Sequence, residues 1–145
     1  MTDGIRATLT RDGGTGEMAV SDVPVAAPTA RSDDVRAALV GRPFASVTEI
    51  ALVDEGRFVG IVPIERLLSA ADETPVGELA EEAVLVPPEG DLEPAARATA
   101  ARGGRSVVVV DADGRFHGLV PPERLLQLLE LEHEEDLARL GGFLR

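Results

Sequence analysis

A thirteen-residue segment occurs twice in this sequence. Residues 56–68, GRFVGIVPIERLL, reappear as residues 114–126, GRFHGLVPPERLL, with ten of thirteen positions identical at an offset of 58. The match extends upstream with a one-residue slip, so that residues 52–54 align with residues 109–111. A repeat of this kind indicates one supersecondary unit present in two copies. We expect the two copies to fill residues 19 to 129.

Each copy predicts the same hairpin. A β-branched run, residues 47–53 or 106–110, ends in an acidic turn that contains glycine. A second apolar strand follows, over residues 58–62 or 116–120. We expect the two strands to pair in antiparallel fashion.

Helices and a short strand complete each predicted unit. A helix precedes each hairpin, because a capping residue stands before a run of helical periodicity. A proline after the hairpin suits the start of a second helix and ends the strand. The expected elements are strands at 23–26 and 84–86, first helices over 35–40 (caps Ser32, Asp33 and Asp34) and 92–101 (cap Asp91), and second helices over 64–70 and from 122, after Pro63 and Pro121.

These elements predict an α/β (α+β) fold made of two β-α-β-β-α repeats. One copy cannot bury the free face of its sheet alone, so the two should pack sheet to sheet about a pseudo-twofold axis. We expect a disordered leader over 1–18, the first repeat over 19–71, the second over 72–129, and an acidic C-terminal helix over 130–145.

The net charge of the chain limits the classes of ligand that it can bind. It has 26 acidic against 14 basic residues, a formal charge of −12, and no cysteine. This charge repels phosphate backbones and attracts cations, so we expect no nucleic-acid partner. The apolar runs are far shorter than the roughly 18 to 20 residues that span a bilayer, so we expect no direct membrane insertion. The lack of cysteine suits a cytoplasmic location.

The repeated segments resemble a family signature. Residues 53–62, VDEGRFVGIV, and 110–120, VDADGRFHGLV, are similar to the V-D-x-x-G-x-h-x-G-h-h motif of tandem cystathionine-β-synthase (CBS) domains, the Bateman module. Residues 130–142, ELEHEEDLARLGG, resemble the helix that connects the second CBS domain to the membrane pore in MgtE-type magnesium transporters. The resemblance implies a regulatory module that senses magnesium for such a transporter.

The acidic helix has its own chemistry. Helical periodicity places Glu132, Glu135 and Asp136 on one face, where like charges destabilise a bare helix by roughly 0.2 to 0.5 kcal/mol per pair. Mg²⁺ favours such hard carboxylate oxygens. A glutamate-rich helix is also typical of a solvated face that keeps a protein soluble. Asp33 and Asp34 could likewise be ligands or caps.

The resemblance to the transporters adds specific metal positions. Glu132, Glu135 and Asp136 match acidic helix positions that bind Mg²⁺ in that family, and Asp91 and Glu93 match an acidic pair that faces them there. The family also places an acid where this chain has Gly103, which is a departure from its pattern.

An adenine nucleotide is the alternative ligand, because many CBS pairs hold one between their repeats. Their motif, G-h-h-[ST]-x-x-D, is broken in both copies, where proline replaces the hydroxyl residue and Arg66 or Arg124 replaces the aspartate. Proline offers a phosphate no donor, and arginine cannot accept hydrogen bonds from a ribose. The two arginines could contact phosphate directly or form internal ion pairs.

We expect no catalytic activity. His117 and His133 are the only histidines, and they do not form a His-His metal pair at helical spacing. The nucleophile-elbow sequence G-x-S-x-G is absent. The family resemblance implies a homodimer and a membrane pore domain, of the same or another chain, as partners at the cytosolic face. A stand-alone nucleotide sensor or a dimerisation module that regulates a separate partner is the other reading.

Overall fold

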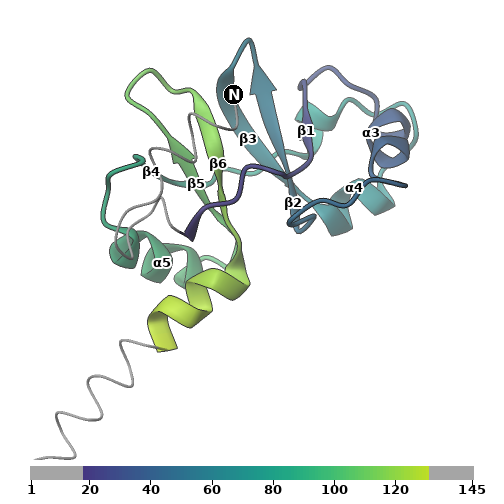
Figure 1. Ribbon diagram of the computed structural model, residues 1–145. Helices are drawn as coiled ribbons and strands as arrows, with labels where there is room; N and C mark the ends of the chain where they lie inside the picture. Colours follow the sequence, from purple (N-terminus) through teal and green to yellow (C-terminus); the bar gives the residue numbers. More distant parts are fainter. Residues whose placement is uncertain (1–17, 131–145) are drawn as a thin grey trace, which may run out of the picture.

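Two three-stranded sheets organise the chain, which this computed structural model describes over residues 18–130. Figure 1 shows the sheets next to each other, with helices beside each. Within each sheet the first two strands are parallel and the last two antiparallel, so both copies have the same topology. The strands are β1 (Val25–Ala26), β2 (Glu49–Asp54) and β3 (Arg57–Pro63), then β4 (Val84–Val86), β5 (Val107–Val110) and β6 (Phe116–Val120).

The predicted α/β fold is confirmed, and most elements lie within two residues of their expected bounds. Strands β4 and β6 have the predicted bounds, as does α5, whose cap Asp91 accepts a hydrogen bond from the amide of Glu93. A 3₁₀ helix in the connection between the repeats was not predicted. Between residues 19 and 130 the helices are α3 (Ser32–Ala38), α4 (Ile64–Ser69), η1 (Val76–Leu79), α5 (Leu92–Ala101) and a further helix at 122–130.

The start of α3 corrects one prediction. The helix begins at Ser32 instead of residue 35, and its N-cap, Arg31, makes no side-chain cap bond. Ser32 was expected to cap the helix, but its hydroxyl donates to the carbonyl of Thr74 at 2.7 Å. Asp33 accepts two bonds from the guanidinium of Arg31. The amides of Ser32 and Asp33 at the start of the helix donate to the carbonyls of Thr74 and Asp72, so the connection between the repeats satisfies them in place of a side-chain cap.

The one-residue slip in the repeat lies in the hairpin turns. The first turn is Glu55 and Gly56, both at positive φ, which is the conformation that a two-residue turn between twisted strands requires. The second copy has one residue more between its equivalent aspartate and glycine, Asp111 and Gly114. Each hairpin also shifts register two residues before that aspartate, so the copies bend alike.

The two hairpins are joined by a reciprocal pair of hydrogen bonds. The amide of Phe58 donates to the carbonyl of Gly114 at 2.9 Å, and the amide of Phe116 donates to that of Gly56 at 3.2 Å. The rings of Phe58 and Phe116 stack with their centroids 6.1 Å apart. Phe58 and Phe116 are equivalent positions of the repeat, and so are Gly56 and Gly114. Exchanging the two copies therefore turns one hydrogen bond into the other, so the contact has a local twofold symmetry.

Each repeat also pairs with the segment that leads into the other. We call residues 18–24 the first lead segment and residues 79–83 the second lead segment. Val20 exchanges two backbone bonds with Leu119 of β6, at 2.7 and 2.8 Å. Glu81 exchanges two with Ile61 of β3, at 2.7 and 3.1 Å. The halves are interlocked, and their division into 19–71 and 72–129 stays a prediction.

Three apolar clusters form the core of residues 18–130. One lies between each sheet and its own helices, and the third joins the two sheets. The buried members of the joining cluster are Val23, Ile61, Val108 and Leu119. The sheet faces that no helix covers are thus buried against each other.

We predict that the joining cluster supplies a large part of the stability. Leu119→Ala should lower the free energy of unfolding by about 2 to 5 kcal/mol, because it leaves a cavity at a fully buried position. Leu126→Ala, the same change at a side chain that is 57% exposed, should cost within about 0.5 kcal/mol. Urea unfolding measures both, and equal losses would contradict this role of the interface.

Candidate functional site

The described part of the predicted metal site lies at the start of α5. The exposed carboxylate of Asp91 caps the helix, with its Oδ1 3.1 Å from the amide of Glu93. Glu93 Oε1 accepts bonds from Nη2 and Nε of Arg97, one turn along, at 2.9 and 3.2 Å. Two carboxylates are thus held at one helix end, both already engaged with the protein.

The other predicted metal residues, Glu132, Glu135 and Asp136, lie outside the described residues. Within residues 18–130, no three acidic or histidine side chains come close enough to hold a metal ion together. Gly103, where the resembled family has an acid, has a φ of +105°. Since side chains disfavour that conformation, the local backbone agrees with the glycine.

Arg66 and Arg124 occupy equivalent positions and make equivalent contacts. Arg66 Nη1 donates to the carbonyl of Leu79 at 3.1 Å, and Arg124 Nη1 donates to that of Met18 at 3.0 Å. Leu79 and Met18 begin the two lead segments. Each arginine therefore binds a lead segment to the repeat whose strand that segment pairs with. Arg66 also lies 3.6 Å from a carboxylate oxygen of Glu81. The ion-pair alternative thus describes Arg66, whereas Arg124 contacts a carbonyl.

An ion-pair network connects the repeats, and the sequence reasoning missed it. Arg105 precedes β5 and pairs with Glu65 of α4 at 2.9 Å and with Glu81 at 3.4 Å. Since Glu81 also neighbours Arg66, two guanidinium groups and two carboxylates form a chain. The backbone amide of Glu65 itself, and next the bond from Arg105, lower the pKa of the Glu65 carboxyl.

Glu49 lies at the centre of the interface and was also missed. It is fully buried at the start of β2, and its Oε1 is hydrogen bonded to the hydroxyl of Ser106. Its Oε2 accepts a longer bond from the amide of Ser106, at 3.4 Å. Burial raises the pKa of Glu49, although the bonds from Ser106 act to lower it. The upstream repeat offset of 57 makes Glu49 and Ser106 counterparts, which is the signal that could have found this pair.

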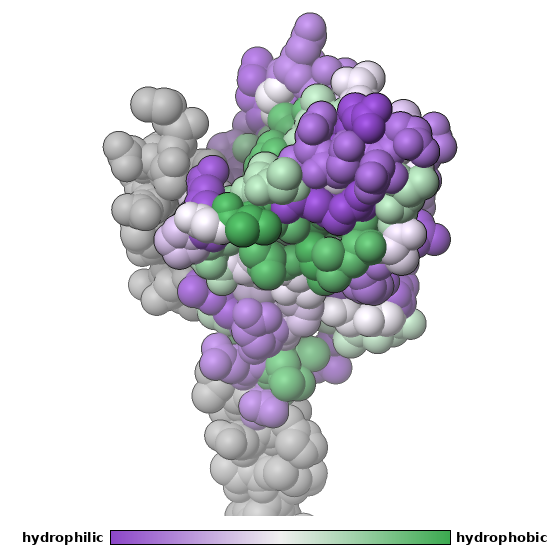
Figure 2. Space-filling model, turned by 90° about the vertical axis from the view of Figure 1, so that its right-hand side faces the viewer, coloured by the Kyte–Doolittle hydropathy of each residue, from purple (hydrophilic) through white to green (hydrophobic). Residues whose placement is uncertain are grey.

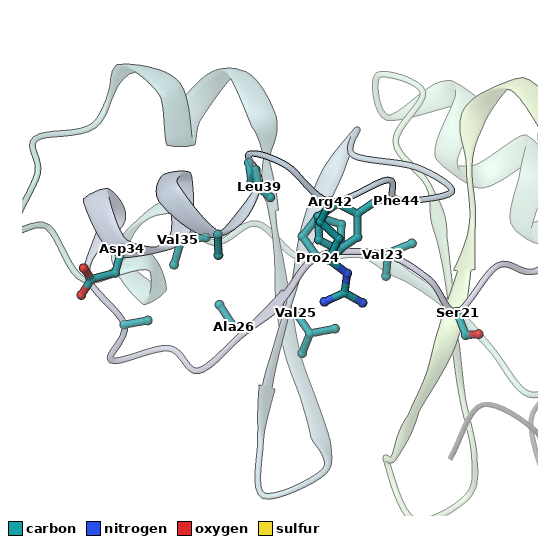
Figure 3. A pocket seen from close by; sticks show the side chains of 12 residues that line it. Ser21, Val23, Pro24, Val25, Ala26, Asp34, Val35, Leu39, Arg42 and Phe44 are labelled. Carbon is teal, nitrogen blue, oxygen red and sulfur yellow. The ribbon is translucent and has the colours of Figure 1, made fainter.

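A cavity of about 470 Å³ opens between the first lead segment, β1 and α3. Figure 3 shows its lining, with Asp34 at one end of α3 and Arg42 beyond the other. The guanidinium of Arg42 lies 4.6 Å from the ring centroid of Phe44 and 3.3 Å from a carboxylate oxygen of Asp22. This cavity could accept a molecule with an apolar part and an anionic group near Arg42.

The second repeat has a smaller counterpart. A cavity of about 320 Å³ lies between the second lead segment and the end of α5. Its walls include Glu81, Glu82, Arg102 and Arg105, so both signs of charge surround it. The two cavities differ in character although they lie at related places in the repeats.

The outer face beside α3 and α4 carries apolar surface. Figure 2 views this side and shows a hydrophobic area bordered by hydrophilic side chains. Large apolar residues that are exposed near these helices are Val40, two residues after α3, and Leu68 of α4. Within residues 18–130, no helix is both long and apolar enough to cross a bilayer.

Comparison with known proteins gives one curated relative and many solved structures. The chain is 36% identical, over 95 residues, to the magnesium transporter MgtE of Thermus thermophilus. The matched region covers 64% of this chain and 21% of MgtE. The chain thus spans about a fifth of the length of that relative. No protein-family model matches the chain.

Two solved structures define the fold. The cytosolic domain of the Mg²⁺ channel MgtE in complex with ATP matches with a TM-score of 0.69 and 26% identity, over 79% of this chain and 48% of that one. A CBS-domain protein of Pyrobaculum aerophilum complexed with AMP matches with a TM-score of 0.67 and 22% identity, over 81% and 96%. The chain therefore has the fold of a CBS-domain pair and resembles MgtE in sequence.

Proposed function

We propose that this chain is a regulatory, ligand-sensing module that responds to magnesium on behalf of an MgtE-like transporter or channel. The observation that carries the proposal is the 36% identity to MgtE over 95 residues, in a chain with the CBS-pair fold. The module acts at the cytosolic face, and its partner is a membrane pore domain of the same or another chain. It performs no catalysis.

Carboxylates of the second repeat and the acidic segment bind the ion in this proposal. Asp91 and Glu93 supply one side, and Glu132, Glu135 and Asp136 supply the other. Mg²⁺ usually keeps several waters and takes one or two direct carboxylates, so it can bridge acids that already make other contacts. The ion shifts the module toward a compact state only as far as it binds that state more tightly. Loss of Mg²⁺ lets the acids repel one another.

The apolar face beside α3 and α4 is the proposed homodimer surface. Val40 and Leu68 are exposed there although both are large and apolar. Contiguous apolar surface of this kind marks association sites on soluble domains. A dimer places two copies of the module under one pore.

An adenine nucleotide is the second candidate ligand. The solved MgtE cytosolic domain contains ATP and the Pyrobaculum protein contains AMP. The cavity beside Arg42 has room for a base and a cation for a phosphate. Against this reading, Arg66 and Arg124 already bind backbone carbonyls.

We predict that Mg²⁺ raises the thermal midpoint of the full chain, because a ligand that binds only the folded state stabilises it by mass action. The comparison is several millimolar MgCl₂ against NaCl of equal ionic strength. The triple variant Glu132→Gln, Glu135→Gln, Asp136→Asn should fold normally and lose the response.

A matched triple variant controls for net charge. Glu73→Gln, Glu78→Gln and Glu123→Gln neutralise three exposed acids outside the proposed site and should keep the Mg²⁺ response. An unchanged midpoint of the natural chain in MgCl₂ would contradict magnesium sensing, and so would a triple-site variant that still responds.

Two substitutions at Asp91 separate its cap from its proposed charge role. Asp91→Ala should destabilise the protein by about 0.5 to 2 kcal/mol, while Asp91→Asn should keep most of that stability, because asparagine also caps helices. Both should weaken the Mg²⁺ response, as measured by calorimetry. An asparagine variant with natural Mg²⁺ affinity would remove Asp91 from the site.

Nucleotide titration tests the second candidate. If a nucleotide binds beside Arg42, calorimetry with ATP, ADP and AMP should show saturable heat that Arg42→Ala weakens at least tenfold, or about 1.4 kcal/mol. Arg57→Ala, which removes an exposed arginine outside the cavity, is the control. Absence of saturable heat with all three nucleotides would exclude this candidate.

A further inference from the structure

Glu49 is a buried acid that the proposed magnesium response does not use. Its side chain is 0% exposed, and it lies where the repeats meet, joined to its counterpart Ser106. Among residues 18–130, no ion pair connects Glu49 to an arginine, and the donors that it has are the hydroxyl and amide of Ser106. A buried carboxylate with only neutral partners favours its protonated form.

A chain of ion pairs with balanced charge lies next to Glu49. Glu65 and Glu81 are the two acids of the neighbouring chain of ion pairs, and Arg105 and Arg66 are its two cations. Ionised Glu49 would act on Arg105, which already pairs with two carboxylates. Arg105 attracts that charge, and Glu65 on α4 repels it. Pro63, which is paired with Glu49 on the neighbouring strand β3, carries no charge.

We propose that Glu49 is a protonation-controlled latch between the two repeats. In its neutral form the carboxyl group joins the start of β2 to the start of β5 through Ser106. Ionisation buries a charge whose desolvation outweighs the stronger bonds from Ser106, so it destabilises the packing of the two repeats. The network of Arg105, Glu65 and Glu81 lies next to the latch, so loosening it also loosens the second lead segment.

The direction of the pH effect follows from burial. The pKa of Glu49 is raised in the folded protein, so the folded state holds a proton that the unfolded chain has lost. The contribution of Glu49 to stability is therefore complete below the ordinary glutamate range and is lost as pH rises through the folded pKa. Asp33, Glu65 and Asp111 have lowered pKa values and act in the opposite direction, so the effect of Glu49 must be isolated by difference.

The test measures unfolding of the full chain by urea between acid and neutral pH, without Mg²⁺. The natural protein and Glu49→Gln are compared, because glutamine imitates the neutral carboxyl group. Relative to this variant, the folding equilibrium constant of the natural protein should fall by up to about tenfold per pH unit within the window, as one bound proton requires. Glu89→Gln, at an exposed glutamate, should keep the natural profile.

Two further measurements keep the test decisive if glutamine prevents folding. Carbon-13 NMR of the Glu49 carboxyl should show a titration midpoint above that of exposed glutamates. Ser106→Ala removes a bond that favours the charged form, so it should move that midpoint still higher. Parallel pH profiles for the natural protein and Glu49→Gln, or a Glu49 midpoint in the ordinary range, would overturn the latch. Because no step uses Mg²⁺, failure here leaves the magnesium proposal standing.

Discussion

The structure depends on the mutual burial of two sheet faces. Each repeat covers one face of its sheet with its own helices, and the other face would meet water if the copies were separated. The joining cluster meets this need, and the reciprocal backbone bonds of Phe58 and Phe116 fix how the sheets meet.

The interface is where the fold and the proposed regulation meet. Arg66 and Arg124 fasten the two lead segments, and Arg105 joins α4 to the second of them. A ligand or proton that acts on one repeat can reach the other through these few contacts. The proposed magnesium carboxylates at the start of α5 belong to the second repeat. The first lead segment pairs with strand β6 of that repeat.

Local sequence patterns predicted the helices and strands well, but they could not predict the contacts between the two repeats. The bounds of α5 followed from Asp91 and the helical period, and those of β6 from the turn before it. The start of α3 was wrong because Thr74, distant in sequence, bonds Ser32. Glu49 was missed because its burial depends on how two copies meet. For Arg66 the sequence suggested a phosphate contact or an ion pair, and its bond to the Leu79 carbonyl was not expected, because a backbone carbonyl leaves no sequence signal.

Hydrogen exchange at the interlocking amides tests most directly whether the repeats form one cooperative unit. The amides of Val20, Glu81 and Leu119 all donate across the halves. If the account is right, they open with the same free energy as the core amides of both sheets, and Mg²⁺ slows all of them together. Exchange of the two repeats with separate free energies, with Mg²⁺ protecting only one, would contradict it.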